Sequence, residues 1–584
     1  MSEYTYPIDD AQFVLQELVE FDQLCERAGH TDVNTELASV ILTQAAKLGS
    51  EVLAPLNKIG DIQHPKLIDL KGQPAIQETA GFSDAYRQYR EGGWASLTGD
   101  ECYGGQNLPN VLGTAVNEIW QSANLAFALC PLLSQGAIEA LTHHASDDLK
   151  EKFLEKMISG DWPGTMNLTE SDAGTDLAAI KTKAVAQDDH YLITGQKIFI
   201  TWGDHQMSDN IVHLVLARLP DAPAGVKGIS LFIVPKFLLD EQGLPGQRND
   251  VYSVSLEHKL GIHGSPTCVM SFGENTGAIG YLVGEEHRGL NYMFTMMNHA
   301  RQGVGLQGLA VSEAAYQHAL AYAKDRLQGT NKDGSRFSII KFADVRRMLM
   351  QMKASTQAMR ALCLVGAAQV DDGDMARVEL MTPIIKGWVT ELAQEVTYQG
   401  VQIHGGMGFI EETGAAQFYR DARILTIYEG TTGIQALDLV GRKTLVNKGE
   451  SLALLLADIS ADYETFAALG AEFELSIAQY RRAITDAVNA RQWLLDNADK
   501  EIAGSVSVNF MMLFGYLCGG WLMAKSAVKA NARLKSGDAK QAQLKAKLVT
   551  SQFYCEHILV RTQSLYQSII AGSNSIMALA EDDF

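Results

Sequence analysis

The sequence predicts a mainly α-helical protein with a central β-domain. Over residues 10–160 apolar residues recur at three- and four-residue spacing, the pattern of amphipathic helices. From about residue 162 the pattern changes to short β-branched and aromatic runs separated by Gly, Pro and Asp, which indicates strands. Helical spacing returns at Leu290 and continues to the end of the chain. The expected order is therefore helical, β, helical, helical.

The length of 584 residues is several times that of a typical domain and supports this division. We expect four domains, and their predicted bounds are a helical N-terminal domain over 1–160, a β middle domain over 161–285, a helical domain over 286–445 and a C-terminal helical extension over 446–584.

Charge and cysteine usage exclude several classes of protein. The net charge of -21 argues against a nucleic-acid-binding surface, although it leaves room for a local basic pocket for a phosphorylated ligand. The 7 cysteines are scattered and show no zinc-ligand spacing, so we predict no metal site, no disulfide framework and a reducing compartment. The acidic N-terminus has only Arg27 as a basic residue before Lys47, so we expect no signal peptide and a cytoplasmic location.

One stretch, from Ala503 to Ala524, carries no charge and has the length of a membrane span. Ser505, Asn509 and four glycines dilute its hydrophobicity, and small residues allow close helix contact. We favour a buried helix, with a subunit or membrane-surface contact as the alternative.

The stretch "ILTIYEGTTGIQALDLVGRK", residues 424–443, places a lone acid, Glu429, between an aromatic residue and a Gly-Thr-Thr-Gly run. A carboxylate with apolar neighbours becomes a better base, because desolvation raises its pKa. The alternative is an ordinary helix N-terminus, where an acid is favourable and Thr431 or Thr432 acts as the cap. These residues alone leave both interpretations open.

Four separated signatures occur in an order that fits one family. They are "MNLTESDAGTDL" from Met166, "GQKIFITWGDH" from Gly195, "HKLGIHGSPT" from His258, and the pair "VQIHGGMGFIEE" from Val401 and "RDARILTIYEGTTGIQ" from Arg420. Together they resemble the acyl-CoA dehydrogenase family over residues 80–445, and the long extension is similar to that of its large bacterial members. The resemblance implies a helical N-domain, a β-barrel middle domain and a four-helix C-domain, with FAD bound where these meet.

The resemblance also implies a chemistry for Glu429. Its position matches the family's catalytic base, which removes the α-proton of an acyl-CoA thioester while flavin N5 takes the β-hydride, giving the trans-2-enoyl-CoA. Apolar surroundings bring the pKa of such a base towards the working pH. A flavin ribityl hydroxyl and the backbone N–H of the base polarise the thioester carbonyl.

Further site residues follow from the matched positions. The implied FAD-binding residues are Met166, Leu168, Thr169, Gly174, Thr175, Phe199, Ile200, Thr201, Arg326, Gln328, Gln402, Gly405, Gly406, Thr431 and Gly433. The implied substrate-binding residues are Thr175, Asn298, Arg301 and Gly430. Arg326 matches an arginine that grips the FAD pyrophosphate of a neighbouring subunit, which implies a homodimer or larger homo-oligomer. For Arg301 a structural ion pair, and for the Gly405–Gly406 run a helix C-cap, remain alternatives.

Three departures from the family pattern affect details of the FAD site. Gly433 replaces a flavin-contacting Gln, Ser171 replaces a Pro, and Gly329 replaces an aromatic residue before an insertion. They leave the adenosine-end contacts of FAD open, but not flavin binding itself.

The resemblance implies a flavoprotein oxidoreductase of fatty acid β-oxidation and lipid metabolism that passes electrons to an electron-transfer flavoprotein. The expected substrate is a fatty acyl-CoA or 3-methylmercaptopropionyl-CoA, and the sequence does not decide the acyl group. Two alternatives stay open: an acyl-CoA oxidase that uses oxygen, and a non-catalytic assembly or scaffold relative.

Overall fold

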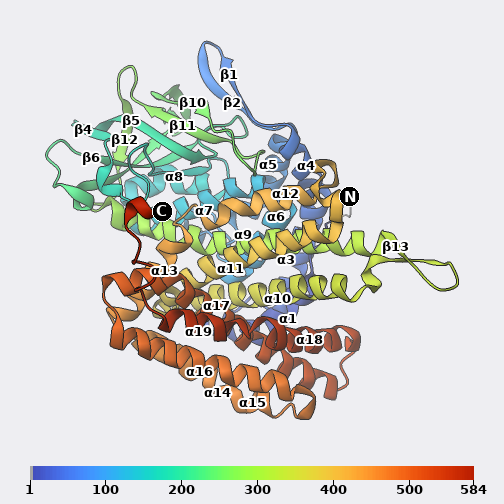
Figure 1. The fold of residues 1–584 in the computed structure, drawn as a ribbon. Helices are drawn as coiled ribbons and strands as arrows, with labels where there is room; N and C mark the ends of the chain where they lie inside the picture. Colours follow the sequence, from blue (N-terminus) through green and yellow to red (C-terminus); the bar gives the residue numbers. More distant parts are fainter. Residues whose placement is uncertain (1–3) are drawn as a thin grey trace. The chain divides into compact units, whose positions relative to one another are not determined.

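The computed structural model describes residues 4–584, and these divide into two compact units (Figure 1). The β unit comprises residues 46–108 and 123–303. The helical unit comprises the residues up to 45, residues 109–122 and residues 304–584. One division between the units falls within the long helix α9 (Gly289–Asp325), so both units contain part of it.

The β unit is built on eight strands that pair in the order β10-β11-β5-β12-β7-β6-β3, with β4 joining β5 to β6. Their bounds are β3 Gly164–Asn167, β4 Lys183–Gln187, β5 His190–Thr201, β6 Val212–Arg218, β7 Ile229–Pro235, β10 Val251–Leu256, β11 Thr267–Phe272 and β12 Ala278–Leu282. Because β5, β12, β7, β6 and β4 each pair with the next and β4 pairs back to β5, these strands close into a small barrel. The hairpin of β8 (Phe237–Leu239) and β9 (Pro245–Arg248) extends the unit.

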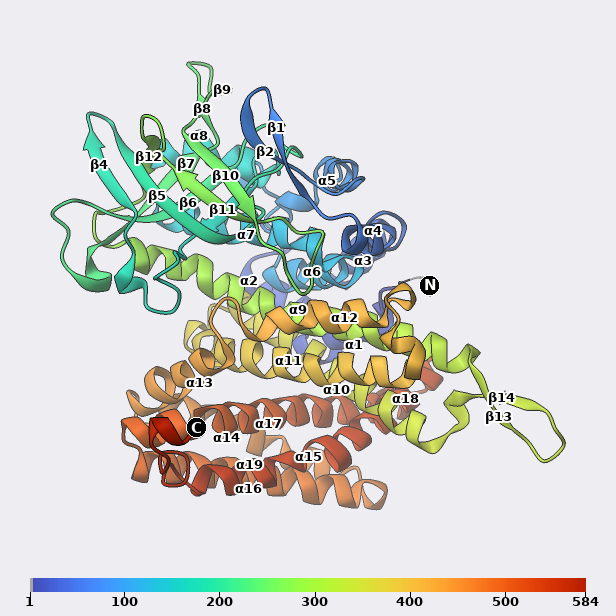
Figure 2. The ribbon, with the colours of Figure 1, turned by 45° about the horizontal axis from the view of Figure 1, so that its top comes forward.

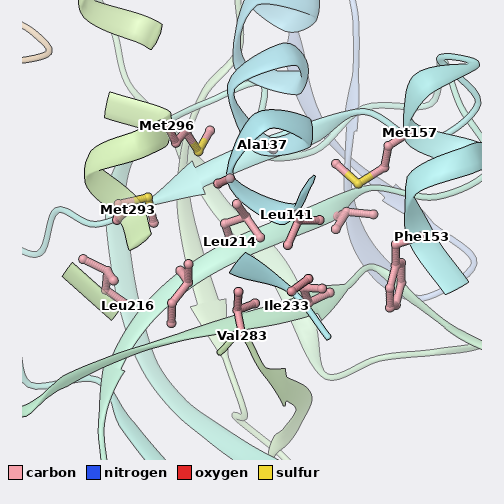
Figure 3. Packing of buried hydrophobic residues seen from close by; sticks show 14 of the residues in the cluster. Ala137, Leu141, Phe153, Met157, Leu214, Leu216, Ile233, Val283, Met293 and Met296 are labelled. Atoms are coloured by element: carbon pink, nitrogen blue, oxygen red, sulfur yellow. The ribbon is translucent and has the colours of Figure 1, made fainter. Parts of the chain in front are cut away.

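Helices cover one face of this sheet. They are α7 (Leu125–His144), α8 (Asp147–Ile158) and the start of α9, and the same unit also contains α4 (Ala54–Ile62) and α5 (Phe82–Glu91). Figure 3 shows Ala137 and Leu141 of α7 packed with Leu214 and Ile233 of the sheet and with Met293 of α9. This apolar layer anchors the barrel, because strands β6 and β7 are buried along almost their whole length.

Two hairpins interrupt regions where the spacing predicts helices. In the β unit, β1 (Lys66–Leu70) pairs with β2 (Gln73–Gln77), and β13 (Leu327–Thr330) pairs with β14 (Arg336–Ser338) in the helical unit. The first hairpin turns at Lys71 and Gly72, with φ of 57° and 82°, values that suit a tight hairpin turn. The helical interpretation is wrong for both segments, because their turn chemistry outweighs a weak apolar periodicity.

The helical unit contains four long helices besides its part of α9: α10 (Ala343–Asp371), α11 (Met375–His404), α16 (Glu474–Asn497) and α17 (Lys500–Lys535). The shorter helices that lie wholly or largely in it are α1 Ile8–Val14, α2 Phe21–Ala28, α3 Thr35–Leu48, α6 Asn110–Ala123, α12 Ala415–Ala422, α13 Thr432–Val440, α14 Glu450–Ala461, α15 Tyr463–Ala467, α18 Gln541–Phe553 and α19 Arg561–Ile570. Figure 2 shows α16, α17 and α19 of the C-terminal extension side by side.

The uncharged stretch predicted as a buried helix forms the centre of α17. Most of its side chains are buried, and α17 packs against α11 and α13. Gly515 lies against the ring of Trp388 on α11, so no side chain fits there. By length and composition α17, α7 and the segment Thr35–Ile62 could each cross a membrane, and 61%, 78% and 28% of their apolar windows are buried in the protein.

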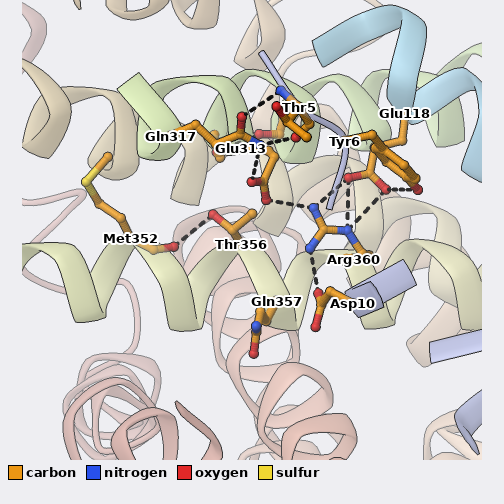
Figure 4. A network of polar contacts seen from close by, with 12 residues as sticks. Thr5, Tyr6, Asp10, Glu118, Glu313, Gln317, Met352, Thr356, Gln357 and Arg360 are labelled. Atoms are coloured by element: carbon orange, nitrogen blue, oxygen red, sulfur yellow. Dashed lines mark hydrogen bonds and ion pairs between the residues drawn. The ribbon is translucent and has the colours of Figure 1, made fainter. Parts of the chain in front are cut away.

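A buried ion cluster joins distant parts of the helical unit (Figure 4). Arg360 of α10 pairs with Asp10 at 2.6 Å and with Glu118 and Glu313 at 2.7 Å each, and Lys547 of α18 pairs with the same Asp10. Burial raises the pKa of Glu118. Burial alone would also raise the pKa of Asp10, but the charges of Lys547 and Arg360 hold it below its usual value. The cluster ties α1 and α18 to the helices between them.

Candidate functional site

Glu429 lies in a tight loop between a 3-10 turn (Arg423–Thr426) and α13. Its φ is 56° and that of Gly430 is 93°, so two consecutive residues have left-handed backbone. For a residue with a side chain this conformation costs roughly 1–3 kcal/mol and persists only where the surroundings enforce it. Thr431 caps α13 by accepting a hydrogen bond from Ile434 N at 3.4 Å. The predicted helix N-terminus is present, and its acid sits in a strained position just before it.

Side chains of α11 and α13 bind the carbonyls of this loop. The buried Lys386 donates from Nζ to the Gly430 carbonyl at 2.6 Å. Gln435, also buried, donates from Nε2 to the Glu429 carbonyl at 3.2 Å. Two consecutive peptide carbonyls are therefore fixed, which accounts for the left-handed backbone.

The residue before Glu429 is fixed as well. Tyr428 donates its hydroxyl hydrogen to Oε1 of the buried Gln307 on α9. Burial, and then the neighbouring Glu429 carboxylate, raise the pKa of Tyr428 well above its usual value, so this hydroxyl stays protonated. Glu429 itself is half-buried. The loop thus holds a carboxylate beside a neutral aromatic residue, a composition suited to a general base.

A second segment, predicted to bind flavin, begins at Met166 within β3, leaves the strand after Asn167 and is organised around the buried Glu170. Its Oε1 accepts hydrogen bonds from Lys197 Nζ at 2.8 Å and Thr182 Oγ1 at 2.6 Å, and Oε2 accepts one from Lys181 N at 2.7 Å. Lys197 Nζ also donates to the Leu168 carbonyl at 2.9 Å. Buried charges are stable only when paired in this way.

The loop leaves Gly174 and Thr175 exposed, whereas Leu168 is buried and Met166 and Thr169 are half-buried. The Thr169 carbonyl accepts a hydrogen bond from Ile198 N at 2.9 Å, which attaches the loop to the end of β5.

The end of β5 contains a β-bulge at the position predicted to pack on the flavin. Between the pairs Cys268–Ile200 and Met270–Lys197 the register shifts, and Phe199 has φ of 60°. Bulges of this kind re-aim side chains and are common beside active sites. The Phe199 side chain is 58% exposed although it is aromatic, whereas Ile200 is buried and Thr201 is half-buried.

Other predicted cofactor residues gather where α11 ends. Gly405 caps α11 with φ of 61°, and Gln402, Gly405 and Gly406 are exposed. His404 stacks on Tyr322 of α9 with ring centroids 4.3 Å apart. This stacking brings the turn close to the end of α9, where the exposed Arg326 and Gln328 lead into the β13 hairpin. The helix C-cap considered for this run is therefore present, and it coincides with an exposed glycine surface.

The predicted substrate residues Asn298 and Arg301 lie one turn apart on the part of α9 in the β unit. The Arg301 side chain is buried and donates from Nη1 to Asn298 Oδ1 at 3.3 Å. Asn298 is exposed.

The structure brings the predicted residues together in three groups. The β unit holds the loop and bulge residues Met166, Leu168, Thr169, Gly174, Thr175, Phe199, Ile200 and Thr201 as one group, with Asn298 and Arg301 on α9. The helical unit holds the other two groups. One lies at the start of α13 and consists of Glu429, Gly430, Thr431 and Gly433. The other lies where α11 and α9 end and consists of Gln402, Gly405, Gly406, Arg326 and Gln328.

Sequence reasoning missed five buried residues that hold these loops: Glu170, Lys197, Gln307, Lys386 and Gln435. For Lys386 a signal exists, because it is a lone charge within the apolar run "MTPIIKGWV". Such a residue must have a buried partner.

Comparisons with known proteins agree with this architecture. Family models match residues 71–161 (acyl-CoA dehydrogenase, N-terminal domain), 165–274 (middle domain), 287–444 (C-terminal domain) and 455–580 (acetyl-CoA dehydrogenase C-terminal like). The chain is 44% identical to the 3-methylmercaptopropionyl-CoA dehydrogenase of Ruegeria pomeroyi over 98% of this chain and 99% of that protein. It is 34% identical to a broad-specificity linear acyl-CoA dehydrogenase of Mycobacterium tuberculosis over 100% of both.

Solved structures share the fold. Caenorhabditis elegans ACDH-11 in complex with C11-CoA superposes with a TM-score of 0.79 at 19% identity, covering 99% of this chain and 95% of that one. An acyl-CoA dehydrogenase from Bacillus anthracis complexed with FAD gives 0.74 at 20% identity, covering 92% and 89%.

A mostly helical protein with a β-barrel middle domain, an additional C-terminal helical domain and a fixed carboxylate loop has the architecture of an acyl-CoA-oxidising enzyme. The chain belongs to the acyl-CoA dehydrogenase family, a family of oxidoreductases. The family and the fold class expected from the sequence are thereby confirmed.

Proposed function

We propose that this protein is an FAD-dependent dehydrogenase that introduces an α,β double bond into an acyl-CoA thioester, with Glu429 as the base. The observation that carries the proposal is the loop of Glu429, whose strained backbone is fixed by Lys386 and Gln435. Strain maintained by dedicated contacts is typical of catalytic positions. FAD, when bound, accepts the β-hydrogen of the substrate together with its electron pair.

The residues present fit FAD. A Cβ added at Gly174, Gly405 or Gly406 would meet no atom within 4 Å, so their backbone is open to a ligand. The exposed ring of Phe199 offers a flat apolar surface of the kind on which an aromatic ring system stacks. We infer that the loop from Met166 to Thr175 and the bulge at Phe199 hold the flavin ring. Arg326, Gln328 and the α11 turn hold the phosphates of the FAD that is bound to a neighbouring copy.

In this mechanism Glu429 takes the α-proton. The thioester carbonyl makes that proton weakly acidic, and removal at neutral pH requires a base with little water around it. Tyr428 directly precedes Glu429 in the chain and Ile434 follows in the first turn of α13, and a bound acyl chain would exclude the remaining water. We infer that the Glu429 N–H, which belongs to the same fixed loop, donates to the thioester oxygen as charge develops there.

Similarity supports the choice of substrates to be tested. The 44% identity to a 3-methylmercaptopropionyl-CoA dehydrogenase and the 34% identity to a broad-specificity linear acyl-CoA dehydrogenase favour 3-methylmercaptopropionyl-CoA or a linear fatty acyl-CoA. We infer that an electron-transfer flavoprotein receives the electrons. We also propose the four-domain division at 160, 285 and 445.

A homo-oligomer fits the surface around the α11 turn. Phe409 is 86% exposed, and Met407 and Ile410 are 45% exposed each, beside Gly405 and Gly406. Clustered exposed apolar side chains mark interaction surfaces. A second copy that covers this turn would place its own groups next to the proposed FAD phosphates. The 7 cysteines are all unpaired in the part of the chain that the structure describes, and we infer a cytoplasmic location.

The test is anaerobic bleaching of the flavin absorbance with a panel of acyl-CoA thioesters from short to long, including 3-methylmercaptopropionyl-CoA. We expect stoichiometric bleaching by at least one thioester and formation of its trans-2-enoyl product. The same acids without CoA serve as controls and leave the spectrum unchanged. A purified protein without flavin, or a flavin that no thioester bleaches, would refute the proposal and support a scaffold.

A further inference from the structure

Lys386 is a fully buried lysine of the helical unit that lies beside the loop of the proposed base. It lies in the middle of α11 between Ile384, Ile385, Gly387 and Trp388, all of them buried. A lysine in such a place loses its hydration, and its charged form must be compensated by neighbouring groups.

The contact of its ammonium group is specific. Nζ lies 2.6 Å from the carbonyl oxygen of Gly430, the residue that follows the base. A neutral donor suffices to bind a carbonyl, as Gln435 does one residue earlier at 3.2 Å. What the lysine adds is a full positive charge at the peptide next to the Glu429 carboxylate.

This inference rests on the proposed role of Glu429 as base. We propose that Lys386 is a positioning residue that holds the Glu429–Gly430 backbone in its left-handed conformation and favours the carboxylate form of Glu429 in the free enzyme. The two effects are linked, because the ammonium group acts through the same carbonyl that fixes the loop.

Other charged groups around the loop contribute to its field. From α11, Glu391 accepts a hydrogen bond from Thr432 Oγ1 at 2.5 Å. Before the loop, Arg423 donates to Thr426 Oγ1 at 2.6 Å, and Asp421 acts with Glu429 to raise the pKa of Tyr428. The stretch of α17 behind α11 and α13 carries no charge between Ala503 and Ala524. By contrast, Lys386 donates a hydrogen bond to the backbone of the loop that contains Glu429.

The experiment compares Lys386→Met with wild type in the FAD-loaded enzyme. The rate of anaerobic flavin reduction by a good acyl-CoA is measured by stopped flow across the pH range in which the enzyme is stable. We expect flavin content and substrate affinity to stay within about threefold of wild type, while reduction slows by about 100-fold at neutral pH. The acid limb of the pH profile should move to higher pH by about one unit, because the carboxylate form has lost its neighbouring positive charge.

Lys547→Met is the matched control. Lys547 is also buried and lies in the same unit, but its ion-pair partner is Asp10 in the ion cluster. We expect this variant to lose thermal stability and to keep the wild-type pH profile. If Lys386→Met does not fold, Lys386→Gln replaces it, since the amide retains a donor without the charge. For Lys386→Gln we expect the acid limb of the pH profile to move to higher pH, as in Lys386→Met.

An unchanged pH profile in the Lys386 variants, whether at full rate or at a uniformly reduced rate, would overturn the inference and leave a structural lysine. Glu429→Gln is measured alongside. If that variant still reduces its flavin, the proposed function fails regardless of Lys386. If it does not, and the Lys386 profile is unchanged, only the present inference fails.

Discussion

At residue 429 one side chain combines three features that are rare separately: a carboxylate, partial burial and left-handed backbone with φ of 56°. Only a few per cent of residues other than glycine adopt positive φ. The contacts of Lys386 and Gln435 show that the conformation is imposed by buried side chains from two helices. The strained backbone is therefore maintained by specific contacts, and this supports a chemical role for the Glu429 carboxylate.

Glu429→Gln tests that role most directly. Because glutamine has the same shape and no proton-accepting carboxylate, we expect retained FAD, retained acyl-CoA binding and flavin reduction slowed by roughly 10³-fold. Stopped-flow bleaching at saturating substrate measures the rate. Glu412→Gln, which changes an exposed acid of the 3-10 turn Glu411–Thr413, is the control and should reduce its flavin at the wild-type rate. Near-normal reduction by the Glu429 variant would mean that another group is the base.

Glu170 gives a prediction about pH. Burial alone would raise the pKa of its carboxyl, but Lys197, Thr182 and the Lys181 N–H hold it below its usual value. A lowered folded-state pKa means that the stabilisation is present above the unfolded value near 4.5 and is lost as the pH falls through the lower folded value. We therefore expect acid to release FAD as this carboxylate is protonated.

Glu170→Gln should lower the free energy of unfolding by about 3 kcal/mol, because Lys197 stays buried without a carboxylate partner. We therefore expect this variant to retain FAD poorly even at neutral pH. Its FAD retention should also vary less with acid than that of wild type. Fluorescence of released FAD follows both effects. Asp172→Asn removes an exposed ion pair with Lys181 from the same loop and should behave as wild type. Equal losses in the two variants would show that the loop does not depend on the buried pair.

Among the elements, those with strong and long patterns follow directly from the sequence. The run "NIVHLVLARL" forms β6, and the uncharged stretch from Ala503 forms the buried centre of α17. The β1–β2 and β13–β14 hairpins were not expected, because they are short and lie beside helices whose apolar spacing dominates any window of that length.

The candidate site, like the two hairpins, could be predicted only in part from the sequence. Motif positions predict Glu429 as the base and the flavin loop, because their spacing along the chain carries the information. The partners that hold them, such as Lys386 for Gly430 and Gln307 for Tyr428, lie 44 and 121 residues away in sequence. Only the tertiary fold determines which buried polar groups meet, so no local pattern predicts these pairs.

Helix α17 gives a prediction at the scale of an element. Gly515 lies against Trp388 of α11, so Gly515→Leu overpacks the contact and should lower the free energy of unfolding by about 3 kcal/mol. Gly504 lies on the same helix with no neighbour within 4 Å of an added Cβ. Gly504→Ala should therefore be neutral or slightly stabilising, since alanine favours helix. Thermal denaturation measures both, and equal melting temperatures would contradict the close packing of Gly515 against Trp388.

In the whole helical unit, the C-terminal extension supports the helices that carry the proposed base. Helix α17 packs on both α11 and α13, the helices of Lys386 and Gln435. At the other end, Arg360 and Lys547 join α10 and α18 to Asp10 of α1. The extension thus contacts both the first helix and the helices behind the base loop.

Assembly gives a prediction through Arg326. If this exposed arginine binds the FAD pyrophosphate of a neighbouring copy, Arg326→Ala should weaken FAD binding by about 2 kcal/mol, the value of a charge-assisted contact. Titration of the apoprotein with FAD measures the change. Lys332→Ala removes an exposed cation from the same hairpin and should leave affinity unchanged. A monomer in solution that retains full flavin occupancy would contradict the assembly.

The destination of the electrons is a property of the whole enzyme, because a dehydrogenase and an oxidase use the same base and the same flavin. In a dehydrogenase the bound enoyl product shields the reduced flavin from oxygen, an effect of a closed site that excludes solvent. We expect slow turnover with oxygen alone and fast turnover with an electron-transfer flavoprotein or a ferrocenium dye. Hydrogen peroxide is measured during steady-state oxidation of a good acyl-CoA, with Glu429→Gln as the background. Peroxide formed stoichiometrically, at the rate of dye-coupled turnover, would identify an oxidase instead.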